Sequence, residues 1–133
     1  MTMTAASVGP QQYGKNYRPL LSSVREVRRD VSLALYTWGL DELVDDTEQI
    51  VSELMANAIE HTESDRIRTT ITKTSDRTVR LEVTDRSPQE PRMHPAGFSD
   101  ESGRGIVLID ALSSKWGWNS IFGGKTVWAE VTG

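Results

Sequence analysis

Three polar side chains recur one helical turn apart in the middle of the chain, within an otherwise apolar helical pattern. Glu53, Asn57 and His61 are spaced four residues apart, and side chains at this spacing lie along one side of an α-helix. A carboxylate can accept a proton from an attacking hydroxyl or water, and an asparagine carbonyl oxygen suits a Mg²⁺ ion that already carries phosphate oxygens. The spacing therefore indicates a metal-and-phosphate site or, on the simpler interpretation, the half-exposed polar edge of a structural helix.

Further candidate residues follow in the second half of the chain. Asp85 ends a pattern of alternating apolar residues, where it can accept a hydrogen bond from an exocyclic amine or begin a turn. Gly103 and Gly105 precede a helical pattern, where they can expose backbone N–H groups to phosphate or simply start the helix. Thr126 follows a Gly-Gly turn and carries no chemical signal by itself. The residue types leave both interpretations open at each position.

Two helices are predicted ahead of the strands. Apolar residues recur at helical spacing over 20–38, and a second stripe of this kind covers 43–59. Gly39 lies between the two stripes and is typical of a helix end. The line of polar residues flanks the second stripe, so this helix would hold them at the margin of the core.

Four strands are predicted after these helices, because β-branched residues are dense there or apolar residues alternate with polar ones. They cover residues 66–73, 78–85, 116–122 and 125–131. A third helix is predicted at 105–115, and residues 86–102, with three prolines, show no periodicity. The order of elements predicts an α+β fold, a two-layer sandwich of a mostly antiparallel sheet with helices packed on one face.

Length and composition restrict the class of protein. The chain has 133 residues, the usual size of one domain, and no cysteine, which excludes disulfides and thiolate metal sites. Its net charge of -4, with both signs interspersed, argues against direct binding of nucleic acid. No apolar run suggests a membrane span or a signal peptide. We therefore expect a soluble cytoplasmic protein without membrane contact, made of a flexible tail at 1–17 and one domain at 18–133.

The types and order of the candidate residues resemble the motifs of the histidine-kinase-like ATPase superfamily. The architecture of that family is called the Bergerat ATP-binding fold. Glu53 to Asn57 looks like the Asn box of that family, and Asp85 looks like its adenine-binding aspartate. The stretch "SGRGIVLIDAL" is similar to a later glycine box, and "GGKTVWAE" to the closing strand. The resemblance covers about residues 20–131, and the small size looks most like the anti-sigma-factor serine/threonine kinases of actinobacteria.

This resemblance implies ATP and Mg²⁺ as cofactors and a role for each candidate. Glu53 would be the general base, and Asn57 would bind the nucleotide through Mg²⁺. The other nucleotide-binding residues would be Asp85 at the adenine amino group with Thr126 beside it, Ser87 near the base, and Gly103, Arg104 and Gly105 at the phosphates. Residues 86–102 would form the ATP lid. The sequence departs from the family pattern DxGxG, because it reads Asp85-Arg86-Ser87-Pro88.

Two functions are consistent with the resemblance. The first is an anti-sigma-factor-type serine/threonine kinase that phosphorylates an antagonist protein with Mg-ATP. The second is a non-catalytic ATP-binding module that sequesters a sigma factor or an antagonist. A sensor-kinase fragment is disfavoured, because residues 20–38 contain no phosphoacceptor histidine. The charged side of that helix is either a solvated face or, as the resemblance implies, a contact surface for a homodimer or a partner.

Overall fold

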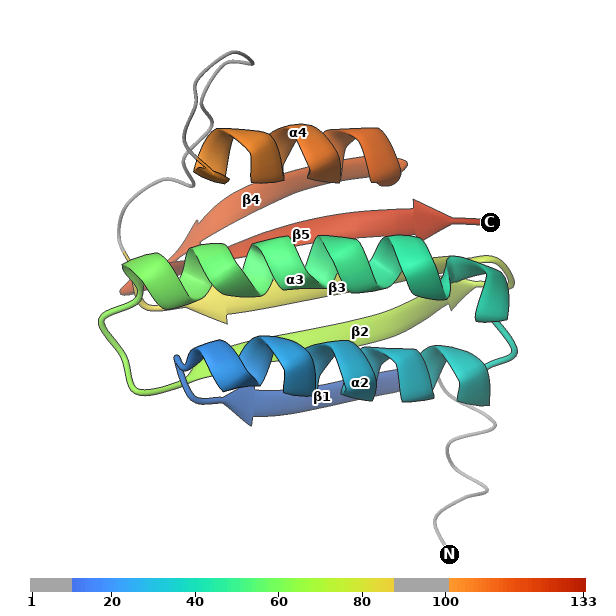
Figure 1. Ribbon diagram of the computed structural model, residues 1–133, viewed down its shortest axis with the longest axis horizontal. Helices are drawn as coiled ribbons and strands as arrows, with labels where there is room; N and C mark the ends of the chain where they lie inside the picture. The colour runs from blue at the N-terminus through green and yellow to red at the C-terminus, as the bar shows by residue number, and fades with distance from the viewer. Residues whose placement is uncertain (1–10, 88–100) are drawn as a thin grey trace, which may run out of the picture.

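The computed structural model describes residues 11–87 and 101–133, and of residues 101–105 it describes the backbone alone (Figure 1). Its elements are the strands of one sheet, helices and a 3-10 turn. In chain order they are β1 (Gln12–Tyr17), α2 (Leu21–Thr37), the 3-10 turn η1 (Asp41–Leu43), α3 (Val44–His61), β2 (Ile67–Ser75), β3 (Thr78–Asp85), α4 (Glu101–Leu112), β4 (Lys115–Ile121) and β5 (Gly124–Thr132).

The strands form one antiparallel sheet in the order β1-β2-β3-β5-β4. The three helices cover one face of this sheet, with α3 between α2 and α4 (Figure 1). The predicted α+β two-layer sandwich is therefore confirmed. Among the residues that the structure describes, no helix is both long and apolar enough to cross a membrane.

The core lies between α3 and the middle of the sheet. Every second residue of β3 is buried, as expected for a strand with one face on the core. α3 presents its buried side to β3 and β5 and contacts the neighbouring helices along its flanks. Its buried apolar residues are Val44, Ile50, Val51, Leu54, Met55 and Ala58. Its half-buried residues, Asn57 and His61 among them, therefore lie at the edge of the packed interface.

β1 corrects one of the predicted boundaries. Residues 12–17 were expected in the flexible tail, yet they form an edge strand that pairs with β2 from Gln12 opposite Thr72 to Tyr17 opposite Ile67. Tyr17 is buried, and its hydroxyl donates a hydrogen bond to Asp30 Oδ2 at 2.8 Å. The strand was missed because its residues are mostly polar and its partner is distant in the sequence. Residues 1–10 lie outside the described structure.

The helix after the long loop also begins earlier than predicted. α4 starts at Glu101, so Gly103 and Gly105 lie inside its first turns and not before them. The expected lid at 86–102 falls mainly on residues 88–100, which lie outside the described residues. The remaining strand and helix predictions agree with the structure to within a few residues at each end.

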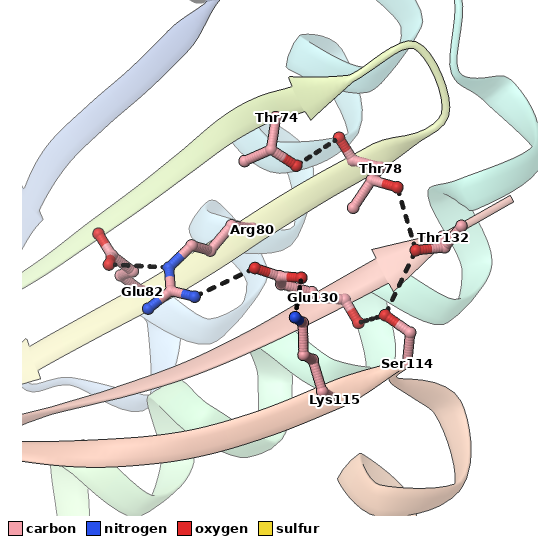
Figure 2. A network of polar contacts seen from close by, with 8 residues as sticks. All are labelled: Thr74, Thr78, Arg80, Glu82, Ser114, Lys115, Glu130 and Thr132. Carbon is pink, nitrogen blue, oxygen red and sulfur yellow. Dashed lines mark hydrogen bonds and ion pairs between the residues drawn. The ribbon is translucent and has the colours of Figure 1, made fainter.

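The face of the sheet opposite the helices carries a network of polar contacts (Figure 2). Arg80 on β3 forms ion pairs with Glu82 and with Glu130 of the neighbouring strand β5, and Lys115 of β4 pairs with Glu130 as well. The Arg80 guanidinium also lies 4.2 Å from the centroid of the Trp128 ring, a favourable cation–π distance. Each of these charges has a partner of opposite sign within the network. The helix side of the sheet is therefore the better candidate for a ligand site.

Candidate functional site

A small enclosed cavity lies where α3, α4 and the ends of β3 and β5 meet. Its volume is about 10 Å³, room for about one water molecule and far less than a purine needs. Among the described residues, its lining consists of Leu54, Asn57, Ala58 and His61 from α3, Val83 and Asp85 from β3, Ile106 from α4, and Lys125 and Val127 from β5. Most of this wall is apolar, and the polar residues gather at one end of the sheet.

Asp85 and Lys125 form a buried ion pair in this wall. They are opposite each other in the register of β3 and β5, and both point to the helix side. The Lys125 ammonium lies 3.2 Å from Asp85 Oδ1 and 3.1 Å from Oδ2. Only 2% of Asp85 and 4% of Lys125 is exposed, so little solvent screens the attraction.

The carboxylate of Asp85 is also held by the backbone that follows it. The Ser87 N–H donates a hydrogen bond to Asp85 Oδ1 at 2.7 Å, and Ser87 is itself buried. The resemblance implied a role for Ser87 near the base, and the structure places this residue next to Asp85 through its main chain. This contact and the ion pair with Lys125 fix the orientation of the carboxylate.

His61 ends α3 at the same cavity. Its Nε2 atom is buried and forms no hydrogen bond within the described part of the chain. Glu60 Oε1 lies 3.4 Å from this atom, a distance that counts as an ion pair only for a protonated imidazole. A buried ring nitrogen without a hydrogen bond is costly, so the site gains if a ligand or water provides a partner.

The structure brings some of the sequence-predicted residues together. Asn57 lies one turn before His61 on α3, and both line the cavity with Asp85. Glu53 is half-buried one further turn back and does not line the described cavity. Gly103, Arg104 and Gly105 immediately precede Ile106, which does line it, so the start of α4 adjoins the site. The proposed roles of these residues stay predictions.

Thr126 is not brought to Asp85. Its side chain lies on the open face of the sheet, where its hydroxyl oxygen is 2.8 Å from that of Thr84. Successive side chains of a strand point to opposite faces, so the preceding residue, Lys125, takes the place beside Asp85 that was expected for Thr126. The residue beside Asp85 is therefore one position earlier in the sequence than the resemblance implied.

Lys125 is a residue that the sequence interpretation missed, although a signal was present. Val127, Ala129 and Val131 alternate as the core face of β5, and Lys125 falls in phase with them. A lysine in phase with a core stripe predicts either a strand end in solvent or a buried cation with a carboxylate partner. The partner, Asp85, is 40 residues away in the chain, and only the register of the sheet identifies it.

Comparison with known families agrees with this geometry. A family model described as the histidine kinase-like ATPase domain matches residues 17–130. The chain belongs to this family, and it therefore carries an ATP-binding domain of the histidine-kinase-like class.

Solved structures with a similar fold include two histidine kinases. The Acinetobacter baumannii histidine kinase AdeS is 14% identical with a TM-score of 0.54, over 90% of this chain and 67% of that chain. The catalytic domain of histidine kinase ThkA, in a nucleotide-free form, is 16% identical with a TM-score of 0.52, over 90% of this chain and 95% of that chain. At such identities the likeness establishes the fold alone.

A curated relative matches a shorter stretch. An uncharacterized protein of Streptomyces coelicolor is 50% identical over 40 residues, which is 29% of this chain. The match spans 38% of the length of that protein. It carries no information about substrate or partner.

Proposed function

We propose that this chain is a Mg-ATP-binding regulatory protein that acts as a serine/threonine kinase of the anti-sigma-factor type on an antagonist protein. The observation that supports it is the meeting of Asn57 from α3 with Asp85 from β3 at one cavity beside the start of α4. An amide oxygen and a buried carboxylate suit opposite ends of a nucleotide, one for the metal and one for the base amine. The protein partner rests on the sequence resemblance.

Each residue has a separate task in this proposal. Asp85 accepts a hydrogen bond from the exocyclic amine of adenine, and the Ser87 N–H keeps the carboxylate oriented. Asn57 offers its side-chain oxygen to Mg²⁺. Bound Mg-ATP would supply the γ-phosphoryl group and leave as Mg-ADP. Glu53 takes the proton from the serine or threonine hydroxyl whose oxygen forms the new bond to phosphorus.

A second candidate function is a module that binds ATP and sequesters a sigma factor or an antagonist without phosphate transfer. One observation favours it. Glu53, the proposed base, does not line the described cavity. A protein in which nucleotide acts only as a conformational ligand needs no positioned base.

The decisive experiment measures phosphate transfer. A partner captured from native lysate is incubated with the full chain and γ-labelled Mg-ATP, and phosphoserine or phosphothreonine on the partner is counted. Wild type should transfer phosphate. Glu53→Gln should bind ATP equally well but transfer about 10²–10⁴ times more slowly, because glutamine cannot accept the proton. The matched control is Glu63→Gln, since Glu63 is exposed just beyond the end of α3.

Three outcomes separate the candidates. Transfer by wild type and by Glu63→Gln, but not by Glu53→Gln, supports the kinase. Transfer by all three proteins keeps the kinase and removes Glu53 as its base. ATP binding and partner binding without transfer by any of them favours the sequestering module.

A further inference from the structure

The helix-side face of the β3–β5 pair is apolar along its length and changes character at one end. Four registered pairs of residues face the helices there. They are Val79 with Val131, Leu81 with Ala129, Val83 with Val127, and Asp85 with Lys125. The charged pair falls where the face reaches the cavity. Apolar residues at these last two positions would have continued the core without the desolvation that burying two charges requires.

The hydrogen-bonding capacity of this pair is only partly used within the described structure. A carboxylate has about four acceptor positions and an ammonium has three donors. Asp85 Oδ1 receives both the Ser87 N–H and Lys125, whereas Oδ2 receives Lys125 alone. The contacts recorded for the Lys125 ammonium among the described residues are both to Asp85. The wall of the cavity can therefore offer one acceptor and one donor side by side.

We propose that Lys125 is a base-recognition residue, which donates a hydrogen bond to N1 of adenine while the 6-amino group of the same base donates to Asp85. This inference rests on the proposed function, because it requires that adenine nucleotides enter this cavity. The Watson–Crick edge of adenine presents the amine and the N1 acceptor next to each other, as the acceptor–donor pair of Asp85 and Lys125 requires.

The same pair rejects guanine placed in the same orientation. Guanine has a carbonyl oxygen where adenine has the amine, and an N1–H donor where adenine has an acceptor. Its oxygen would face the Asp85 carboxylate, and its N1–H would face the Lys125 ammonium. Asp85 alone would give one unfavourable contact, and Lys125 adds a second.

Room for the base requires that the cavity walls separate. The lysine side chain has a flexible four-carbon stem, so its ammonium can follow the base edge while it stays near Asp85. Ile106, at the start of α4, forms the facing apolar wall and has no polar group to compete for the base. The base would therefore find its polar contacts on β3 and β5 and its apolar contacts on α3 and α4.

The test uses calorimetric binding of three nucleotides in Mg²⁺ buffer to the full chain. They are ADP, 1-deaza-ADP, which lacks the N1 acceptor, and 7-deaza-ADP, which lacks an acceptor on the opposite edge of the base. Wild type should bind 1-deaza-ADP about 10-fold to 100-fold more weakly than ADP, as expected for the loss of a bond to a charged group. It should bind 7-deaza-ADP like ADP.

A variant completes the test. Lys125→Met should bind ADP and 1-deaza-ADP equally, because the donor that distinguishes them is gone, and its preference for ADP over GDP should fall. Lys115→Met is the matched control, since Lys115 is an exposed lysine on β4, and it should keep the wild-type preferences. The comparison of nucleotides on wild type stands even where Lys125→Met does not fold.

The outcomes separate this inference from the function beneath it. Equal binding of ADP and 1-deaza-ADP by wild type overturns the role of Lys125 and leaves ATP binding intact. An unchanged preference in a folded Lys125→Met variant does the same, and the ion pair is then structural. No binding of any adenine nucleotide by wild type overturns the proposed function, and this inference with it.

Discussion

The backbone of Gly124, the first residue of β5, lies against the end of β3. A Cβ atom at Gly124 would stand 2.0 Å from the carbonyl oxygen of Asp85. Real Cβ atoms do not approach a backbone oxygen so closely, and a backbone cannot step aside as a flexible side chain can. The absence of a side chain at position 124 therefore lets Lys125 and Asp85 meet across the two strands.

Gly124→Ala should accordingly displace the end of β3 and weaken ADP binding together with stability. We expect a loss of about 1–3 kcal/mol in the free energy of unfolding, as for other overpacked sites. Urea unfolding and calorimetry on the same samples measure the two effects. Asn119→Ala on the neighbouring strand is the control, because Asn119 is exposed. A Gly124→Ala variant as stable as wild type would contradict the close approach of Gly124 to the backbone of Asp85.

Asn57→Ala should remove Mg²⁺-dependent ATP binding and leave the fold intact. Asn57 is half-buried at the edge of α3, and alanine is a better helix former, so the helix should not suffer. The measurement is ATP affinity with Mg²⁺ and with EDTA, alongside a thermal unfolding curve. If the variant and wild type show the same affinity in both buffers, Asn57 is not the metal ligand.

Asp85→Asn should cost stability as well as affinity, because it leaves the buried Lys125 ammonium without its carboxylate. Removing one partner of a buried pair typically costs about 3–5 kcal/mol. The double variant Asp85→Asn with Lys125→Met should regain part of this stability and none of the preference for ATP over GTP. A single variant as stable as wild type would show that the pair contributes little to the fold.

Tyr17 should make the protein less stable in alkali. Its burial, together with its hydrogen bond to Asp30, raises the pKa of the phenol well above its usual value near 10. The ammonium of Lys15 beside it also has a raised pKa, mainly through its hydrogen bond to Glu26. A group whose pKa is higher in the folded than in the unfolded protein makes its full contribution to stability below about pH 10. This contribution falls as the pH rises further.

The comparison of Tyr17→Phe with wild type checks that stability falls, and does not rise, in alkali. At pH 8 the variant should be less stable by about 1.5–3 kcal/mol, the range for a hydrogen bond to a charged group. The difference should shrink when urea unfolding is repeated above pH 10, because only wild type must keep a buried phenol protonated. Tyr13→Phe, on the same strand, is the matched control. A constant difference across this pH range would refute the prediction.

The local pattern of apolar and polar residues was enough to predict most helices and strands of this protein. The apolar spacing of 3.6 residues predicted α2 and α3, and a high density of β-branched residues or alternation of apolar and polar residues predicted the strands β2, β3 and β5. The line of Asn57 and His61 at the margin of the core followed from the same periodicity. These features depend on neighbours a few residues apart, so the sequence alone determined them. The same alternation predicts that residues 125 and 126 face opposite sides.

The tertiary structure decided the rest, because sheet pairing depends on residues that are far apart in the chain. β1 is a strand only through its ladder with β2, in which Gln12 lies opposite Thr72. Lys125, and not the expected Thr126, lies beside Asp85 because the register of β3 and β5 places Lys125 opposite it. A shift of one residue turns every side chain of a strand to the other face. Packing of the apolar face against α3 selects the register, and this selection is a property of the whole fold.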